Sequence, residues 1–330
     1  GSRATERRRK RVMNNDILQE IAKRINRAND IALYCHTKPD GDALGSMLAL
    51  YVALKNKGKN VAAYCDSTVP EKYKCLYKSE EITFPQKRVH ELAIGIDSSS
   101  IDRLGQCMKS FLSAKAQIAI DHHKSFERFA SLCYVDGDAS ACAEIVFELL
   151  KGMKAIDENV AKLLFCGIVT DSGCFSYSNV TKRTHEIACE LLKYDFDASG
   201  TIYDVYRSIS LDKFNLKRRA LANVKFFENN QIAVMRFMAD DFAATNTTCD
   251  DTEGIVSELI DVDRVKVAYA LSQVGERNFK MSIRTKDPVD ACDIAMTFGG
   301  GGHKNAAGCR VNGYLEDIEE KLVKLAKDRI

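Results

Sequence analysis

Short apolar runs alternate with amphipathic helical stretches from about residue 14 to residue 209, and this alternation constrains the fold more than any other feature. The apolar runs that read as buried strands are IALYC, VAAYC, LAIGI and QIAI. The stretches with helical spacing are residues 16–28, 43–58, 140–152 and 158–169. Short buried strands that alternate with helices predict an α/β fold with a doubly wound, mostly parallel sheet.

The pattern changes after residue 211. A stretch rich in lysine and arginine over residues 212–230 predicts a linker helix. A smaller α/β domain then follows: a strand at 231–239, a hairpin in which VKVAYALSQ and FKMSIRT flank GERN, a loop GGGGHKNAAG at 299–308 and a last helix at 314–330. We therefore divide the chain into a basic tail at 1–13, a first domain at 14–211, the linker helix at 212–230 and a second, smaller domain at 231–330.

Composition excludes several classes of protein. The net charge is +2, and much of the basic excess lies in RATERRRKR near the amino terminus, so the rest offers no duplex-binding surface. That basic run is either a solvated tail or the stub of a longer protein. The 12 cysteines show no C-x-x-C pair and no zinc spacing, which is typical of reduced cysteines in a cytosolic protein. With no long apolar stretch and no signal peptide, we expect a cytoplasmic protein without a membrane segment.

Carboxylates and imidazoles lie where the apolar runs end. They are His36, Asp40 and Asp42 after IALYC, Asp97 after LAIGI, Asp121, His122 and His123 after QIAI, and Asp171 in GIVTDSG. In open α/β sheets, ligands bind beyond the carboxyl ends of the strands, so we expect these side chains to converge. Such a set suits two divalent metal ions, manganese first, with magnesium, cobalt or iron as alternatives. Two metals can activate a water and neutralise a phosphoryl group, which points to phosphoester hydrolysis.

Each of these residues also has an ordinary structural explanation when it is taken alone. Asp40 and Asp42 are typical of a helix N-cap and a turn, and Asp97 is typical of a turn that ends a strand. Asp171 could cap a helix. The combination favours a site over a set of unrelated caps.

The second domain carries its own candidates. Consecutive glycines at Gly301 and Gly302 let a backbone approach a phosphate, and His303 follows them directly. In FKMSIRT the alternation places Ser282 and Arg284 on the face away from the core, and arginine is a bidentate partner for phosphate. A flexible turn and a solvated strand face remain the alternatives for these two segments.

These motifs resemble those of a known family. H-x-x-x-D-x-D, the isolated strand-end aspartate, D-H-H and T-D-S-G are similar to the motifs of the DHH phosphoesterase superfamily. GGGGHKNAAG is similar to the signature of its DHH-associated C-terminal domain. The resemblance covers nearly the whole chain from about Asn15 and is closest to the branch that degrades nanoRNA and dephosphorylates 3′-phosphoadenosine 5′-phosphate (pAp). One departure is Ser98, where the family often has a further acid after the strand-end aspartate.

The resemblance implies a role for each candidate. One metal would be held by His36, Asp40 and Asp97, and the other by Asp42, Asp97, His122 and Asp171, with Asp97 bridging. Asp121 would orient a histidine, and His123 would contact the phosphate or protonate the leaving oxygen. Arg284, Ser282, Gly301, Gly302 and His303 would bind the far end of the nucleotide, which favours short substrates.

The first hypothesis is therefore a manganese-dependent phosphodiesterase and phosphatase acting on short single-stranded RNA and pAp, as a homodimer without duplex nucleic acid or membrane partners. The alternative in the same superfamily is hydrolysis of cyclic di-AMP or its linear product pApA. An inorganic pyrophosphatase has similar metal motifs, but the glycine–histidine signature argues against it. A nucleotide-binding regulator without turnover is disfavoured because all candidate ligands are present.

Overall fold

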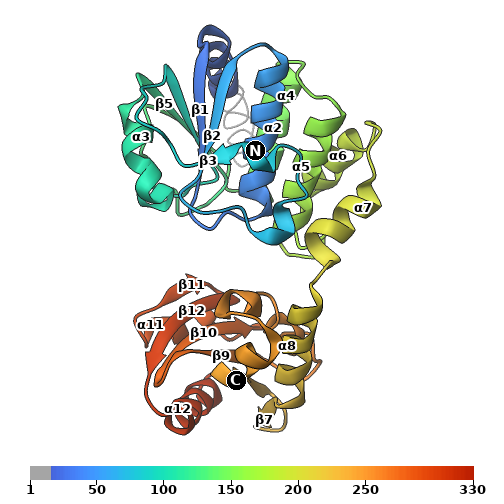
Figure 1. Ribbon diagram of the computed structural model, residues 1–330. Helices are drawn as coiled ribbons and strands as arrows, with labels where there is room; N and C mark the ends of the chain where they lie inside the picture. Colours follow the sequence, from blue (N-terminus) through green and yellow to red (C-terminus); the bar gives the residue numbers. More distant parts are fainter. Residues whose placement is uncertain (1–15) are drawn as a thin grey trace, which may run out of the picture. The chain divides into compact units, whose positions relative to one another are not determined.

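The computed structural model describes residues 16–330, so the predicted basic tail lies outside the described part. The chain divides into two compact units, Gly1–Ser208 and Ile209–Ile330. Each unit is built around its own six-stranded sheet (Figure 1). The predicted α/β fold class is confirmed, and the two units are described separately below.

The first unit contains a fully parallel sheet in the order β3-β2-β1-β4-β5-β6. Its strands are β1 (Asp30–Cys35), β2 (Asn60–Tyr64), β3 (Ile82–Thr83), β4 (Leu92–Ile96), β5 (Ala116–Asp121) and β6 (Leu132–Val135). The predicted strands are β1, β2, β4 and β5. Strands β3 and β6 were not predicted, because they are short and lie at the two edges of the sheet, where they are only partly buried.

Helices cover both faces of this sheet. On one face, residues 16–27 are helical and pack with α2 (Gly41–Asn56), α4 (Cys142–Gly152) and α5 (Glu158–Asp171). The opposite face is covered by the 3₁₀ turn η3 (Ile101–Cys107) and α3 (Met108–Ser113) (Figure 1). Strand β1 shows why both faces are covered. Leu33 packs in the core formed with α2, α4 and α5, and Tyr34 packs in the core formed with η3 and α3, so the strand is buried on both sides. The remaining helical segments are η1 (Glu71–Tyr73), η2 (Ser79–Glu81), α6 (Lys182–Leu191), α7 (Ala198–Ile202) and the π-turn η4 (Tyr203–Arg207).

The second unit contains a mixed sheet in the order β11-β12-β10-β9-β8-β7, in which only β8 and β9 pair in parallel. Its strands are β7 (Lys225–Phe227), β8 (Ile232–Phe237), β9 (Val267–Gly275), β10 (Asn278–Thr285), β11 (Gly301–His303) and β12 (Ala306–Asn312). The expectation of a loop over residues 299–308 was wrong. Gly301 pairs with Gly308 and Gly302 with Ala307, so this segment forms a hairpin that satisfies its backbone groups.

Helices also lie on both faces of the second sheet. One face packs against α11 (Ala291–Met296) and α12 (Leu315–Lys327). The other packs against α8 (Leu211–Ala222), α9 (Ala239–Thr245), η5 (Cys249–Thr252) and α10 (Ser257–Ile260). The segment predicted as one linker helix is helix α8 followed by strand β7. Leu216 and Ala220 of α8 are buried in this unit's core, so the helix is part of the second unit's packing.

No helix among residues 16–330 has the length and apolar character needed to cross a lipid bilayer.

Close packing of α2 against α5 depends on glycine. A Cβ atom on Gly45 would lie 2.5 Å from the carbonyl oxygen of Leu163 and 3.0 Å from the backbone nitrogen of Gly167. Because these are backbone atoms, α5 would have to move away. Helix α2 carries Asp42 and α5 ends at Asp171, so this contact also sets the separation of two candidate ligands.

We expect Gly45→Ala to lower the free energy of unfolding by about 1–3 kcal/mol, because the added methyl group overpacks the helix crossing. Gly152→Ala is the matched control, since its Cβ would meet no atom within 4 Å. It should be neutral or stabilising by up to about 1 kcal/mol. Urea unfolding of both variants measures the difference, and equal stability would contradict the packing argument.

Candidate metal centre

The candidate residues of the first unit meet where the strand order of its sheet reverses. From β1 the chain passes to β2, which lies on one side of β1 in the sheet, and later to β4, which lies on the other side of β1. His36 directly follows β1, Asp97 directly follows β4, and Asp121 ends β5. Three strands therefore deliver polar side chains to one crevice at their carboxyl ends, the usual place for ligands in this architecture.

One group of possible ligands consists of His36, Asp40 and Asp97. Nε2 of His36 lies 3.7 Å from Oδ2 of Asp40 and 3.8 Å from Oδ2 of Asp97. Nδ1 of His36 is 2.8 Å from the carbonyl oxygen of Thr37. A proton on Nδ1 satisfies that carbonyl and leaves the lone pair of Nε2 facing the two carboxylates.

Asp40 combines the two roles weighed from the sequence. Its Oδ1 accepts hydrogen bonds from the backbone nitrogens of Asp42 at 3.1 Å and Ala43 at 3.0 Å, which makes it the N-cap of α2. Its Oδ2 is the oxygen that faces His36. The cap therefore fixes the carboxylate and leaves one oxygen available to a metal.

A second group consists of Asp42, His122 and Asp171. Nε2 of His122 lies 3.8 Å from Oδ2 of Asp42 and 3.4 Å from Oδ2 of Asp171. Nδ1 of His122 is 3.2 Å from the carbonyl oxygen of Ala139, which again directs the bare nitrogen toward the carboxylates.

Asp97 lies between the two groups. Its Oδ2 faces His36, and its Oδ1 lies 3.5 Å from Nε2 of His122. The residue is 2% exposed, and within the described part of the chain Oδ1 has no hydrogen-bond partner. Asp97 also has a φ of 55°, in the left-handed region, a conformation that costs a non-glycine residue about 1–3 kcal/mol. A buried, unpartnered carboxylate oxygen on a strained backbone fits a ligand that bridges two cations.

The electrostatics of the group agree with that fit. Burial, followed by the charges of Asp42, Asp40 and Asp171, raises the pKa of Asp97 well above its usual range. Burial and then the charge of Asp42 raise the pKa of Asp171 to about 8. Without cations, these carboxylates are held together against their mutual repulsion, and bound dications would offset it.

Asp121 is a member of neither group. Its Oδ1 accepts hydrogen bonds from the backbone nitrogens of His122 at 2.6 Å and His123 at 2.9 Å. The same oxygen is 2.6 Å from Nδ1 of His123. Asp121 therefore holds the His123 ring, whose side chain is 35% exposed, rather than contributing to either ligand group.

In the second unit, the candidate substrate contacts lie on two strands, β10 and β11, with β12 between them. Ser282 and Arg284 lie on β10, opposite Gly308 and Ala306 of β12. Gly301 and Gly302 lie on β11, and His303 pairs with Ala306. These residues share one region of one sheet.

Comparison with known proteins decides the family. The description "DHH family, N-terminal domain" matches residues 30–168, and "DHHA1 domain" matches residues 229–330. The bifunctional oligoribonuclease and PAP phosphatase of Thermus thermophilus is 30% identical over 320 residues, which cover 95% of this chain and 94% of that protein. The chain belongs to the DHH superfamily.

Other relatives agree. The protein of the same name from Bacillus subtilis is 26% identical, with 90% of this chain and 94% of that protein covered. Among solved structures, an exopolyphosphatase-related protein from Bacteroides fragilis superposes with a TM-score of 0.89 over 95% of this chain and 96% of its own, at 24% identity. That structure supports the fold of this DHH chain, and the curated relatives place it in the nanoRNase and PAP phosphatase branch.

A short segment at the start of α4 contacts two ligands of the second group directly and the third through Asn179. The backbone nitrogens of Cys142 and Ala143 donate to the Asp42 carboxylate at 2.5 and 2.9 Å, so Asp42 caps α4 from another helix. The Ala139 carbonyl oxygen faces His122, as described above. Nδ2 of Asn179 donates at 3.0 Å both to the carbonyl oxygen of Asp171 and to that of Ser140. Residues 139–143 thus connect all three ligands.

A buried polar cluster in turn fixes this segment. Oε1 of Glu144, which is 0% exposed, accepts hydrogen bonds from Oγ of Ser140 at 2.6 Å and Oγ1 of Thr184 at 2.7 Å. Arg183 donates to Asp136 at 2.7 Å. The sequence did not predict this cluster. The available signal was Glu144 itself, a carboxylate within the apolar stretch ACAEIVFELL.

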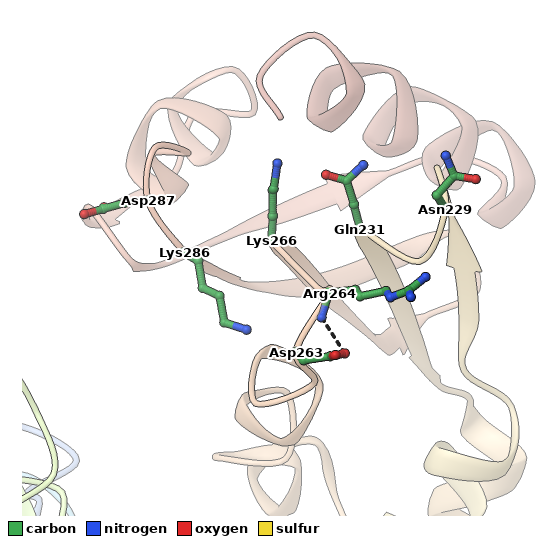
Figure 2. A pocket seen from close by; sticks show the side chains of 7 residues that line it. All are labelled: Asn229, Gln231, Asp263, Arg264, Lys266, Lys286 and Asp287. Atoms are coloured by element: carbon green, nitrogen blue, oxygen red, sulfur yellow. Dashed lines mark hydrogen bonds between the residues drawn. The ribbon is translucent and has the colours of Figure 1, made fainter.

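A separate hollow of about 410 Å³ lies at one end of the second sheet. It is lined by Asn229, Gln231, Asp263, Arg264, Lys266, Lys286 and Asp287. Figure 2 shows the Lys266 and Gln231 side chains pointing to one side of the sheet and Lys286 to the other. Because the lining side chains do not converge, we assign no ligand to this hollow.

The pKa of Asp171 predicts a pH dependence for the metal-free protein. The folded state keeps the Asp171 proton up to about pH 8, whereas the unfolded chain loses it near 3.8, so stability falls as pH rises through that window. The raised pKa of His122, where the charges of Asp42 and Asp171 outweigh burial, acts in the same direction. We expect a lower melting temperature in EDTA at pH 8 than at pH 6, and a smaller difference in Asp171→Asn. Calorimetry measures both, and a rise in melting temperature toward pH 8 would contradict the assignment.

Asn179→Ala should weaken one of two metal-binding events by about 10–100-fold, because the variant loses both hydrogen bonds that tie Asp171 to residue 140. Isothermal titration with Mn²⁺ measures each event. Ser178→Ala, at the neighbouring exposed position, is the matched control and should bind both ions normally. If the two variants bind Mn²⁺ alike, Asn179 has no positioning role.

Proposed function

We propose that this DHH protein is a two-metal phosphoesterase that hydrolyses short single-stranded oligoribonucleotides and pAp. The observation that carries the proposal is the position of Asp97: its Oδ2 lies 3.8 Å from Nε2 of His36 in one ligand group, and its Oδ1 lies 3.5 Å from Nε2 of His122 in the other. The printed names of the relatives, oligoribonuclease and PAP phosphatase, support the choice of substrate.

His36, Asp40 and Asp97 would hold one metal ion, and Asp42, Asp97, His122 and Asp171 the other. These are oxygen and imidazole donors without a thiolate, which suits Mn²⁺, with Mg²⁺, Co²⁺ or Fe²⁺ as alternatives. Such ions supply a nucleophilic water that ionises near neutral pH and neutralise the charge of the phosphoryl oxygens.

The chain's own residues would orient the substrate and move a proton. His123 is partly exposed, and its Nδ1 is held by Asp121, so its other nitrogen is free to donate a proton to the leaving oxygen. Asp121 would keep the imidazole in the required tautomer and stabilise its protonated form.

The second unit would bind the remainder of the nucleotide. Arg284 lies on the polar face of β10 with Ser282, and arginine matches the geometry of a phosphate. Gly301, Gly302 and His303 on β11, which is separated from β10 by β12, would complete this contact. The alternative substrate class is cyclic di-AMP or its product pApA, which would use the same metal centre. A homodimer stays a prediction.

A substrate panel with Mn²⁺ tests the proposal. We expect wild-type protein to turn over pAp and a five-nucleotide RNA faster than pApA, cyclic di-AMP or pyrophosphate. Asp97→Asn should lower kcat/KM on both preferred substrates by about 10²–10³-fold, because it removes several kcal/mol of stabilisation supplied through the shared ligand.

Asp102→Asn is the matched control, because it makes the same chemical change at an exposed position in the neighbouring turn η3. It should retain wild-type activity. Full activity of Asp97→Asn would refute the bridging role, and preferential turnover of cyclic di-AMP or pApA would favour the alternative substrate class.

A further inference from the structure

One face of the second sheet is polar and basic along β10 and β12. Burial alternates strictly along β10: Phe279, Met281 and Ile283 enter the core beneath α11 and α12. Lys280, Ser282 and Arg284 therefore lie on the opposite face. The alternation places two cations and a hydroxyl in a row along one strand.

The partner strand extends this face. In the antiparallel register, Arg310 of β12 lies directly opposite Lys280, and Gly308 and Ala306 lie opposite Ser282 and Arg284. Residues opposite each other in a sheet share a face. Glycine and alanine project little from the backbone, so the cationic side chains are the main feature of this part of the sheet.

On this side, helix α8 packs on β8, and helix α10 packs on β9 and on part of β10. Met235, Ala268 and Ala270, on β8 and β9, belong to the core formed with α8 and α10. Neither Lys280 nor Arg310 belongs to a hydrophobic core, and Arg310 is exposed. The basic pair is therefore accessible within its own unit.

The pair has no compensating charge. Like charges placed directly opposite each other in a sheet are destabilising. Over residues 16–330, neither Lys280 nor Arg310 forms an ion pair, and this face of β10 and β12 carries no acid. The acidic turn η5 lies on this side: its Thr252 is 3.4 Å from Ser272 of β9, the register partner of Lys280. The Asp251 carboxylate of this turn accepts a hydrogen bond from the backbone nitrogen of Thr248. The repulsion between Lys280 and Arg310 destabilises the folded state. An anion bound at this pair would explain why the two charges lie together.

The spacing indicates which anion. Lys280 and Arg284 are four residues apart on one strand, which corresponds to about 13–14 Å. Neighbouring phosphates of one nucleotide are closer together than this, whereas phosphates farther apart along an extended oligonucleotide span it. The same face of β10 and β12 carries no aromatic side chain on which a base could stack.

We propose that Lys280 and Arg310 form a second phosphate site, which binds an oligonucleotide phosphate beyond the one held at Arg284. The inference rests on the proposed function and adds a physical basis on which the protein would distinguish substrates by their length. pAp has only two phosphates, one for the metal centre and one for Arg284, so it leaves this pair unused. RNA of three or more nucleotides gains a third phosphate contact, without preference for base identity.

The test compares wild-type protein with the Lys280→Gln/Arg310→Gln double variant. The ratio of kcat/KM for a 5′-phosphorylated five-nucleotide RNA to that for pAp should fall about 10-fold, mostly through KM, and equally for oligo-A and oligo-U. The salt dependence of RNA binding, measured by fluorescence anisotropy in EDTA, should also decrease. The melting temperature should not fall, because the change removes a repulsion.

Lys324→Gln is the matched control, since Lys324 is exposed on α12, which packs on the opposite face. It should leave the ratio and the salt dependence as in the wild type. An unchanged ratio in the double variant, or an equal loss for pAp and RNA, would overturn the second phosphate site. Failure of the proposed function has a different signature, because wild-type protein would then turn over neither substrate while RNA binding in EDTA could still be measured.

Discussion

The first unit depends on one constraint. Several buried carboxylates approach one another closely at the point where the strand order of its sheet reverses. Asp97 emerges in a strained conformation between Asp42 and Asp171, and burial together with their charges raises its pKa. Such a cluster persists only where the surrounding structure holds it. The backbone donors of α4 bind the Asp42 carboxylate, and Gly45 lets α5 bring Asp171 close. Cations are the natural compensation for this charge.

The two ligand groups differ in how they are supported. Asp40 and His36 are fixed locally, by the cap of α2 and by the adjacent Thr37 carbonyl. Asp42, His122 and Asp171 instead depend on one distant segment, residues 139–143, and on the buried Glu144 cluster that holds it. We therefore expect substitutions far from these residues to disturb the second ligand group more than the first.

Much of the first unit could be predicted from the sequence, because its signals are local. Strands β1, β2, β4 and β5 are continuous apolar runs, and a parallel sheet with its ligands at the carboxyl ends follows from their alternation with helices. The short edge strand β3 has no such signal. In the second unit, the glycine-rich segment reads as a loop from composition, but it pairs with β12 as a hairpin, because strand pairing depends on a partner distant in sequence.

The sequence by itself determined the fold class, the family motifs and the identity of the polar residues at the strand ends. Only the tertiary structure decided where each of them lies relative to the others. Asp42 lies in helix α2 and Asp97 follows strand β4. Their separation is therefore set by packing between these elements rather than by spacing along the chain. The same holds for Lys280 and Arg310, which are unremarkable charges in sequence and become a like-charged pair only through the register of β10 with β12.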